Sequence, residues 1–305
     1  MHPRPVDGLR GVVRRVCRLR RGDGERGGGD LVLSSLVFDG RVREVADVAG
    51  YRVVAHAELG STNSAGLALA GEGDPGNLWV VARRQVAGRG RRARPWVSEP
   101  GNLYASLLLI DPGAGERVGQ LPLVAALALA EAVDAMTGSY GLARLKWPND
   151  LLVDGAKISG ILLEATVLAD GRRAVVCGFG LNLAHHPDLA GYAATDLAGL
   201  GFAVAPERAF RALAESASKQ LARWHDAPFS GILEDWRARA VGIGAPIRVR
   251  LETRELAGVF AGLDSDGRLV LDQGDGRHTT VSAGDVFFEP SAISGGAAGS
   301  GGQGM

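Results

Sequence analysis

Residues 142–183 read LARLKWPNDLLVDGAKISGILLEATVLADGRRAVVCGFGLNL. The Asp-Gly pairs at 154–155 and 170–171 are strong two-residue hairpin signals between apolar segments. The segments on either side of the second pair, 157–168 and 172–183, are therefore predicted to lie side by side as antiparallel strands. This stretch places a β-sheet at the centre of the fold.

The rest of the chain adds helices to this sheet and then changes character. Strands are expected at 51–55, 78–82, 102–110 and 142–146, a short helix after residue 63, and longer helices at 120–136, 206–224 and 231–240. From residue 246 onward, short alternating segments with turns at 266–267 and 275–276 are typical of a small β-barrel. The predicted fold class is α+β: a mixed β-sheet with helices, followed by a small C-terminal β-barrel.

Composition sets the expected domain boundaries. Residues 1–48 form an Arg/Gly-rich arm that we expect to be disordered, because it has no periodic apolar face. The main domain is expected over 49–240 and the barrel over 241–290, and 291–305 is a flexible Gly-rich tail without core-forming residues. The arm shows no helix-turn-helix periodicity, so a DNA-binding domain is not expected.

The overall composition suits a soluble globular protein. Of the 305 residues, 46% are hydrophobic and 22% are charged, and the formal net charge is zero, so no global field directs the chain to nucleic acid or to a membrane. The most apolar run, 121–136, contains Glu131 and Asp134 and is interpreted as a core helix. Cys17 and Cys177 are not expected to pair, and without a secretory signal the expected location is the cytoplasm.

Lysine is scarce, and its positions single out one segment. Arg and Lys together number 34, but only three residues are lysines, and two of them, Lys146 and Lys157, lie in the quoted stretch. An ammonium is a compact point charge that a planar guanidinium does not replace. Solvated loop charges would be the simple explanation. Trp147 and Pro148, however, are apolar and stiff, so we interpret both lysines as anion-binding groups.

A second unusual segment, residues 88–96, reads GRGRRARPW. Glycine lets backbone N–H groups come close to a phosphate, and arginine offers paired donors to phosphate oxygens. Such a loop between two strands predicts a polyphosphate site. A nucleic-acid-binding surface is the alternative, but the rest of the chain has neither a basic surplus nor many aromatic residues for base stacking.

Two further segments supply neutral polar groups. Residues 60–63, GSTN, follow a strand and fit a helix start, where a hydroxyl would cap the helix and free N–H groups could bind a polar ligand. Residues 178–183, GFGLNL, end a buried strand with Asn182 near its tip. The glycine spacing there is not that of a dinucleotide-binding fingerprint.

The remaining motifs of common enzyme classes are missing from the sequence. We find no Ser/His/Asp triad, no GxSxG elbow, no Walker loop and no spaced set of metal ligands. What remains is a group of cations, amides and glycine loops without a protein nucleophile. This group suits adenylate transfer, in which a substrate carboxylate attacks a nucleotide phosphate and the protein positions the reactants and stabilises charge.

Six motifs occur in order between residues 60 and 182: GSTN, Q-x-A-GRGRRxRxW, GNLY, KWPNDLL, K-x-x-GIL-x-E and GxGLN. They resemble those of the biotin–protein ligases, also called biotin–[acetyl-CoA-carboxylase] ligases or holocarboxylase synthetases, and the resemblance covers about residues 51–290. The resemblance implies a catalytic domain like that of class II aminoacyl-tRNA synthetases. It further implies that biotin and ATP form biotinyl-5′-AMP and pyrophosphate, and that a lysine of a biotin carboxyl carrier domain then receives the biotin. Mg²⁺ is implied as well, carried mainly by the ATP phosphates.

The family motifs give each candidate residue an expected role in this sequence. Lys157 and Arg89 are expected to be catalytic. Biotin is expected to contact Ser61, Thr62, Asn63, Gln85, Arg89, Gly90, Arg91, Lys157 and Gly160. ATP and the adenylate are expected to contact Arg91, Arg94, Trp96, Lys146, Asn149, Asp150 and Asn182. Since some family members carry an N-terminal repressor domain, the Arg/Gly-rich arm predicts a monofunctional ligase here.

Two other functions stay open at this point. A lipoate or octanoate ligase or transferase shares the implied fold but does not join GRGR to KWPND, and binding assays with biotin and lipoate would separate the two. A nucleic-acid-binding protein built on the Arg-rich segments is the more remote alternative, and it would show a steep dependence of DNA affinity on salt. The sequence leaves the oligomeric state undetermined.

Overall fold

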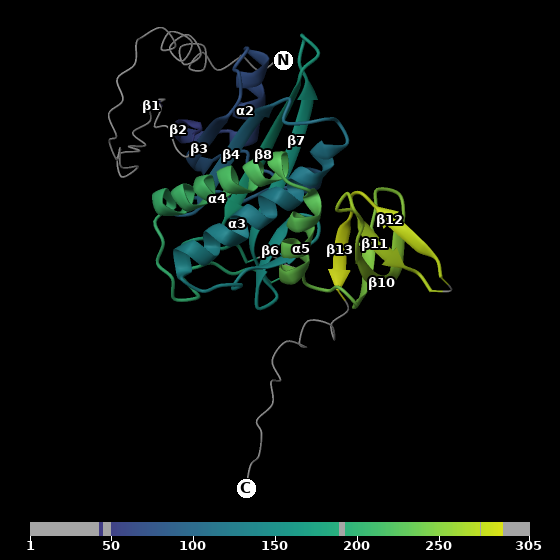
Figure 1. The fold of residues 1–305 in the computed structure, drawn as a ribbon. Coiled ribbons are helices and arrows are strands. Elements are labelled where there is room, and N and C mark those ends of the chain that lie inside the picture. The colour runs from purple at the N-terminus through teal and green to yellow at the C-terminus, as the bar shows by residue number, and fades with distance from the viewer. Residues whose placement is uncertain (1–42, 45–49, 189–192, 275, 289–305) are drawn as a thin grey trace.

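The computed structural model describes residues 43–44, 50–188, 193–274 and 276–288, which form a main domain and a smaller all-β domain (Figure 1). The predicted C-terminal tail and most of the predicted N-terminal arm lie outside these residues. Arg43–Glu44 is an exception, because it forms strand β1 and pairs antiparallel with β2, Arg52–Leu59. This part of the predicted arm therefore belongs to the sheet.

The main domain is built on an eight-stranded sheet with the order β1-β2-β3-β4-β8-β7-β6-β5. The other strands are β3 Leu78–Gln85, β4 Leu103–Ile110, β5 Arg144–Lys146, β6 Asp150–Val153, β7 Ala156–Val167 and β8 Arg173–Leu181. β2 and β3 run parallel, and every other neighbouring pair runs antiparallel. The prediction of a mixed sheet is confirmed, and the quoted stretch supplies its four consecutive antiparallel strands β5 to β8.

Helices cover both faces of this sheet. They are α2 Thr62–Gly71, α3 Leu121–Thr137, α4 Pro206–Asp226 and α5 Phe229–Arg239. Trp79 and Val81 on β3 join the core beneath α3, α4 and α5, whereas Leu78 and Val80 point the opposite way into the smaller core beneath α2. The alternation follows from the period of two along a strand. The central strands are therefore apolar on both faces.

Helix α3 is the most apolar segment of the fold. Together with the 3₁₀ turn before it, it spans 21 residues, Arg117–Thr137, and among the described residues it alone is long and apolar enough to cross a membrane. In this structure 72% of its most apolar window is buried, and it packs against α4 and α5. It ends where Gly138 adopts a left-handed conformation with φ 70°. The segment thus has the position expected of a core helix.

The C-terminal domain is an antiparallel sheet with the order β12-β11-β10-β9-β13. Its strands are β9 Pro246–Arg250, β10 Glu255–Leu263, β11 Leu269–Asp272, β12 His278–Val281 and β13 Asp285–Phe288. The predicted small all-β unit is present, although among the described residues its pairing ends at β12 and β13 and does not close into a ring.

Both domains share one hydrophobic core. Val249 and Phe260 of the C-terminal sheet belong to the same buried cluster as α3 and α5. The indole nitrogen of Trp147 also donates a hydrogen bond of 3.1 Å to the carbonyl of Gly267. These contacts fix the C-terminal sheet against the turn between β5 and β6.

The three lysines lie in two places. Lys146 ends β5 and Lys157 lies near the start of β7, and both side chains are largely covered. Lys219 lies on α4, where its side chain is 68% exposed and its ammonium is 3.2 Å from the Glu131 carboxylate. Only Lys219 therefore presents its amine openly to solvent.

Candidate active site

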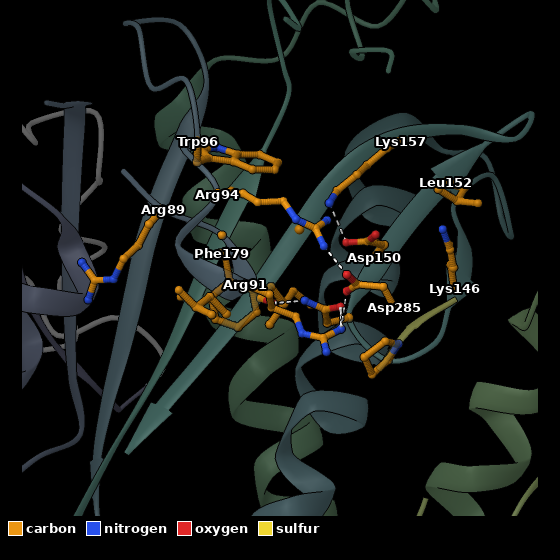
Figure 2. Close-up of a pocket in the computed structure, with 18 of the residues that line it drawn as sticks. Arg89, Arg91, Arg94, Trp96, Lys146, Asp150, Leu152, Lys157, Phe179 and Asp285 are labelled. Atoms are coloured by element: carbon orange, nitrogen blue, oxygen red, sulfur yellow. Dashed lines mark hydrogen bonds and ion pairs between the residues drawn. The ribbon is translucent and has the colours of Figure 1, made fainter. Parts of the chain in front are cut away.

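A cavity of about 420 Å³ lies between the main domain and the C-terminal sheet. The segments around it are the start of α2, the end of β3, loop 88–96, the end of β5 with the turn into β6, the hairpin of β6 and β7, the end of β8, and β13. Figure 2 shows the charged side chains that extend into it from these segments. The sheet order brings together pieces that are more than a hundred residues apart in the chain.

One end of the cavity is neutral and polar. Because β2 and β3 are parallel neighbours, the start of α2 and the end of β3 meet there. Gln85 Oε1 accepts a hydrogen bond of 2.8 Å from the backbone N–H of Thr62, and Gln85 Nε2 donates one of 3.0 Å to the Ser98 hydroxyl. The Ser61 hydroxyl caps α2 by accepting from the backbone N–H of Ser64. This end therefore offers ordered hydroxyl and amide groups.

Asn63 links this neutral end to β7. Its Nδ2 donates hydrogen bonds of 3.1 Å to the carbonyl of Leu162 and of 2.8 Å to the Glu164 carboxylate. Its Oδ1 lies 2.6 Å from the hydroxyl of Ser106 on β4. All of its side-chain groups are thus engaged by the protein, although Asn63 also lines the cavity.

Arg89 is held at the side of the cavity. Its guanidinium donates hydrogen bonds of 3.0 Å to both carboxylate oxygens of Glu164 and one of 2.8 Å to the Ser64 hydroxyl. Figure 2 shows the Arg89 side chain extending away from Lys157. The two residues expected to be catalytic are therefore not brought together here, because the Glu164 carboxylate holds the guanidinium. A catalytic role for Arg89 stays a prediction.

Glycines form the floor of the cavity. Gly160 on β7 and Gly180 on β8 are direct partners across the sheet, and the Trp96 indole lies over both of them. A Cβ atom at position 180 would lie 2.6 Å from that indole, and one at position 160 would lie 3.2 Å from it. A Cβ atom at Gly178 would overlap the side chain of Asn63. Glycine is needed at these positions because aromatic and amide groups lie directly on the strands.

Two ammonium groups lie at the other end of the cavity. Lys157 Nζ is 2.7 Å from the Asp150 carboxylate and 5.4 Å from the centre of the Trp96 ring. Lys146 Nζ is 5.5 Å from the Phe288 ring. Burial lowers the pKa of Lys146, while the Asp150 carboxylate partly opposes this shift. The Asp150 carboxylate therefore interacts electrostatically with both ammonium groups.

Three arginines of loop 88–96 converge on one carboxylate of β13. Arg91 and Arg92 are each 3.6 Å from Asp285, and Arg94 forms an ion pair with the same carboxylate (Figure 2). Arg91 also donates a hydrogen bond of 2.9 Å to the carbonyl of Gly284. Burial lowers the pKa of Arg91 and Asp285 opposes this shift. The cluster has more positive than negative charge, so it can accept a further anion.

All but one of the site residues predicted from the sequence line this cavity. The exception is Asn182, which is buried and is not among the lining residues. Its Nδ2 donates a hydrogen bond of 3.0 Å to the carbonyl of Thr195, and its backbone N–H donates one of 2.9 Å to the carbonyl of Ile158. The predicted contact of Asn182 with the adenylate is not supported by this position, because its amide braces the loop after β8 instead.

Several residues at the site were missed by sequence reasoning. Asp285 and its neighbours 286–288 come from the C-terminal domain, and nothing in their local pattern points to a cavity formed by residues so far away. Phe179 also lines the cavity, and its position between the two glycines of GFGLN could have indicated it. Ser106 supports the neutral end from behind and lies outside the motifs, whereas Glu164 ends the K-x-x-GIL-x-E motif but was given no role of its own.

The described residues contain no group of three or more His, Cys, Asp or Glu side chains placed to hold a metal ion. Asp150 and Asp285 are the carboxylates among the lining residues, and both are paired with cations. A divalent cation that prefers oxygen ligands would therefore need most of them from a bound substrate.

Two protein-family models match the chain. The model described as the Biotin/lipoate A/B protein ligase family matches residues 69–182, which include most of the cavity lining. The model described as the Biotin protein ligase C terminal domain matches residues 242–289, which include strands β9 to β13. The first match lies within the main domain and the second within the C-terminal domain.

Individual proteins align over most of the chain. A biotin--[acetyl-CoA-carboxylase] ligase of Paracoccus denitrificans is 40% identical over 238 residues, covering 76% of this chain and 98% of that protein. A protein of the same name from Mycobacterium tuberculosis is 38% identical over 250 residues, covering 75% and 86%. A solved biotin protein ligase from Aquifex aeolicus in complex with biotin and ATP aligns with a TM-score of 0.66 at 26% identity, covering 78% of this chain and 98% of that one.

Proposed function

Because the chain belongs to the biotin protein ligase family, we propose that it joins biotin to a lysine side chain of a carrier protein in two steps driven by ATP. In the first step a biotin carboxylate oxygen attacks the α-phosphorus of ATP, and the bond from that phosphorus to the bridging oxygen breaks, which gives biotinyl-5′-AMP and pyrophosphate. In the second step the lysine amine attacks the acyl carbon, which gives an amide and AMP, and the amine proton is lost to solvent.

The division of one cavity into a neutral and a cationic end supports this proposal most directly. Thr62 and Gln85 offer hydroxyl and amide groups suited to an uncharged polar ring. Lys157, Lys146 and the arginines of loop 88–96 offer cations suited to a carboxylate and a polyphosphate. Biotin and ATP bound side by side would present these groups in the same order.

The cationic end would act mainly through charge. A carboxylate and a phosphate repel each other, and nearby cations lower the free energy of bringing them together. The Lys157 ammonium, oriented by Asp150 and lying over the Trp96 ring, would stabilise the charge that builds up on the reacting phosphate. No protein nucleophile is needed, because the substrate carboxylate is itself the attacking group.

We also propose that Mg²⁺ accompanies ATP at this site. The ion would offset the charge of the phosphates, which would supply most of its ligands, with the carboxylates of Asp150 and Asp285 nearby. Pyrophosphate release should stop when a chelator removes Mg²⁺ and resume when Mg²⁺ is restored. Undiminished release in the chelator would refute the requirement.

The proposed acceptor is the biotin carboxyl carrier domain of an acyl-CoA carboxylase, and the proposed location is the cytoplasm. The names of the relatives from Paracoccus denitrificans and Mycobacterium tuberculosis favour this acceptor. The match to a C-terminal domain described for biotin protein ligases favours biotin over lipoate, although the larger model covers both kinds of enzyme.

Labelling of a purified carrier domain tests the function. The full chain is incubated with carrier, ATP, Mg²⁺ and either biotin or lipoate, and the carrier mass is measured. One biotinyl group should be added only when biotin and ATP are both present, and lipoate should not replace biotin. Labelling by lipoate or octanoate in place of biotin would reassign the substrate. Salt-sensitive DNA binding without any acyl transfer would favour the nucleic-acid alternative instead.

A further inference from the structure

A chain of hydrogen bonds runs behind the neutral end of the cavity, from loop 88–96 to Thr62. Glu164 binds the Arg89 guanidinium at 3.0 Å and accepts from Asn63 Nδ2 at 2.8 Å. The Ser106 hydroxyl lies 2.6 Å from Asn63 Oδ1 and 2.6 Å from Thr62 Oγ1. Ser106 is fully buried on β4 and does not line the cavity, so its contacts are only with the protein.

The proton positions along this chain are determined by its acceptors. The Leu162 carbonyl can only accept, so Asn63 turns its amino group toward Leu162 and Glu164 and its carbonyl oxygen toward Ser106. That carbonyl oxygen can also only accept, so Ser106 donates its single proton to it. Ser106 must then accept at its other contact, and Thr62 is the donor there.

The direction of this chain decides what Thr62 can offer a ligand. The Thr62 hydroxyl proton points to Ser106, so only its lone pairs are available on the cavity side. Gln85 Oε1 lies 3.1 Å from Thr62 Oγ1 and competes with Ser106 for the Thr62 proton, but the three contacts share only two hydroxyl protons. The longest contact, to Gln85, is therefore the one left without a proton, and Gln85 Oε1 stays an acceptor that already receives the backbone N–H of Thr62. Two acceptor oxygens thus lie side by side with no hydroxyl proton between them. A ligand N–H placed there would satisfy both, whereas a ligand oxygen would meet only lone pairs.

We propose that Ser106 is a positioning residue that commits Thr62 as a hydrogen-bond acceptor, so that the neutral end of the cavity selects a ligand N–H. For biotin, the group selected is a ureido N–H, and in this respect the inference rests on the proposed function. The Leu162 carbonyl and Glu164 together orient Asn63, and Glu164 connects these hydrogen bonds to Arg89 of the arginine loop.

Replacing Ser106 and a matched serine in the full-length protein tests the proposal. Ser159 on β7 is equally buried and also makes a hydrogen bond of 2.6 Å. Its partner is the carbonyl of Gly180, which does not belong to the series of hydrogen bonds from Glu164 to Thr62. Ser106→Ala should raise the KM for biotin about tenfold or more in pyrophosphate release, as expected for a lost polar contact. The KM for ATP and the kcat at saturating biotin should stay close to wild type. Ser159→Ala should leave the KM for biotin near the wild-type value.

Biotin analogues separate hydrogen-bond direction from packing. The two cyclic carbamates that replace one ureido N–H with oxygen are compared with biotin in direct binding measurements. Wild type should bind one of them much more weakly than biotin, and Ser106→Ala should lose most of that discrimination. Ser106→Cys keeps a side chain of similar shape with a weaker hydrogen-bond donor, so its discrimination between biotin and the carbamate should lie between those of wild type and Ser106→Ala. Unchanged biotin binding by Ser106→Ala, or weaker binding with full discrimination, would overturn the role of Ser106. Failure of wild type to bind biotin would overturn the proposed function instead.

Discussion

Lys157 lies where three features of the cavity meet, namely the Asp150 carboxylate, the Trp96 ring and the glycine floor. Lys157→Ala is expected to slow pyrophosphate release at saturating biotin and ATP by about a hundredfold or more, the size of effect seen when one donor to a developing anion is lost. Lys157→Arg should also be slow, because a planar fork does not fit the place of a point charge. Single-turnover kinetics measures the step directly.

Lys219→Ala is the matched control for Lys157→Ala, because it removes an exposed ammonium on α4 and should keep the wild-type rate. Thermal unfolding of each variant shows whether the fold is retained. A rate for Lys157→Ala within about threefold of wild type, less than about 1 kcal/mol of transition-state stabilisation, would exclude a catalytic role for Lys157.

Lys146 is expected to make phosphate binding at this site depend on pH in the alkaline range. Burial lowers its pKa from the ordinary lysine value of 10.5, so its ammonium loses its proton at a lower pH than an exposed lysine does. Phosphate binding needs the charged form, so the affinity for a non-hydrolysable ATP analogue should fall as pH rises through this lowered pKa. Lys146→Met should bind the analogue more weakly at neutral pH and lose this part of the pH dependence. If the affinity of wild type and of Lys146→Met for the analogue changed with pH in the same way, the titrating group would be one other than Lys146.

At the scale of an element, loop 88–96 is a short hairpin closed by its own backbone. Gly90 N–H donates to the carbonyl of Arg94 at 2.8 Å, and Trp96 N–H donates to that of Gly88 at 2.9 Å. The turn enclosed by these two hydrogen bonds holds Arg92 and Ala93 at φ values of 54° and 56°. This is the left-handed region, which costs non-glycine residues free energy. The loop therefore depends on contacts beyond itself, and the Asp285 carboxylate provides them.

Asp285→Asn should loosen this loop in the absence of ligand. The three arginines that share the carboxylate would lose their ion pairs, so trypsin should cleave after residues 91 or 92 about tenfold faster, as expected for a loss of about 1.4 kcal/mol of protection. Limited proteolysis followed by mass spectrometry gives the rate at each site.

Asp264→Asn is the control for Asp285→Asn, since it removes a carboxylate of the same domain that pairs with Arg268 away from the loop. Its cleavage pattern in loop 88–96 should match that of wild type. Equal cleavage rates in Asp285→Asn and wild type would mean that the hydrogen bond from Arg91 to Gly284 is enough to hold the loop.

At the scale of the whole molecule, the C-terminal sheet forms one wall of the cavity and part of the shared core. A chain that ends at Val241 would lose Asp285 and the aromatic side chains of β13, but would keep Thr62 and Gln85 of the neutral end. We expect it to bind ATP far more weakly while its biotin affinity falls much less, as measured by calorimetry on the same preparation. The full-length Asp285→Ala variant keeps the C-terminal sheet but loses one charged group of the cavity wall. Its ATP affinity therefore shows the effect of the wall without the loss of stability that truncation causes. Equal loss of both affinities would mean that the domain acts only through the fold.

The sequence predicted those parts of the site that depend on local pattern. The motifs of the main domain identified nearly every lining residue there, because each motif fixes a turn, a strand end or a helix start. The same patterns could not reveal which partner each charge has. Arg89 is bound by Glu164, a residue 75 positions later, and this pairing depends on the packing of α2 against β7.

The particular residues that the second domain contributes to the cavity could not be predicted for a related reason. Asp285 lies about 190 residues from the arginines it holds, and its strand is an ordinary alternating segment. Asn182 shows the converse case, in which a residue within a strong motif hydrogen-bonds the backbone of a neighbouring loop. Both cases concern contacts that form only when separate elements come together.

The distribution of lysines has a consequence for self-modification. The proposed intermediate is a mixed anhydride that acylates amines, and the protein that makes it has only three side-chain amines of its own. Lys146 and Lys157 are largely covered, so only Lys219 presents an exposed amine. Intact-mass analysis after prolonged turnover without carrier should show few adducts on lysine, and peptide mapping should place most of them on Lys219. Lys219→Arg should then resist acylation of its lysines during turnover, and heavy labelling of Lys146 or Lys157 in this variant would show that the cavity does not shield its own amines.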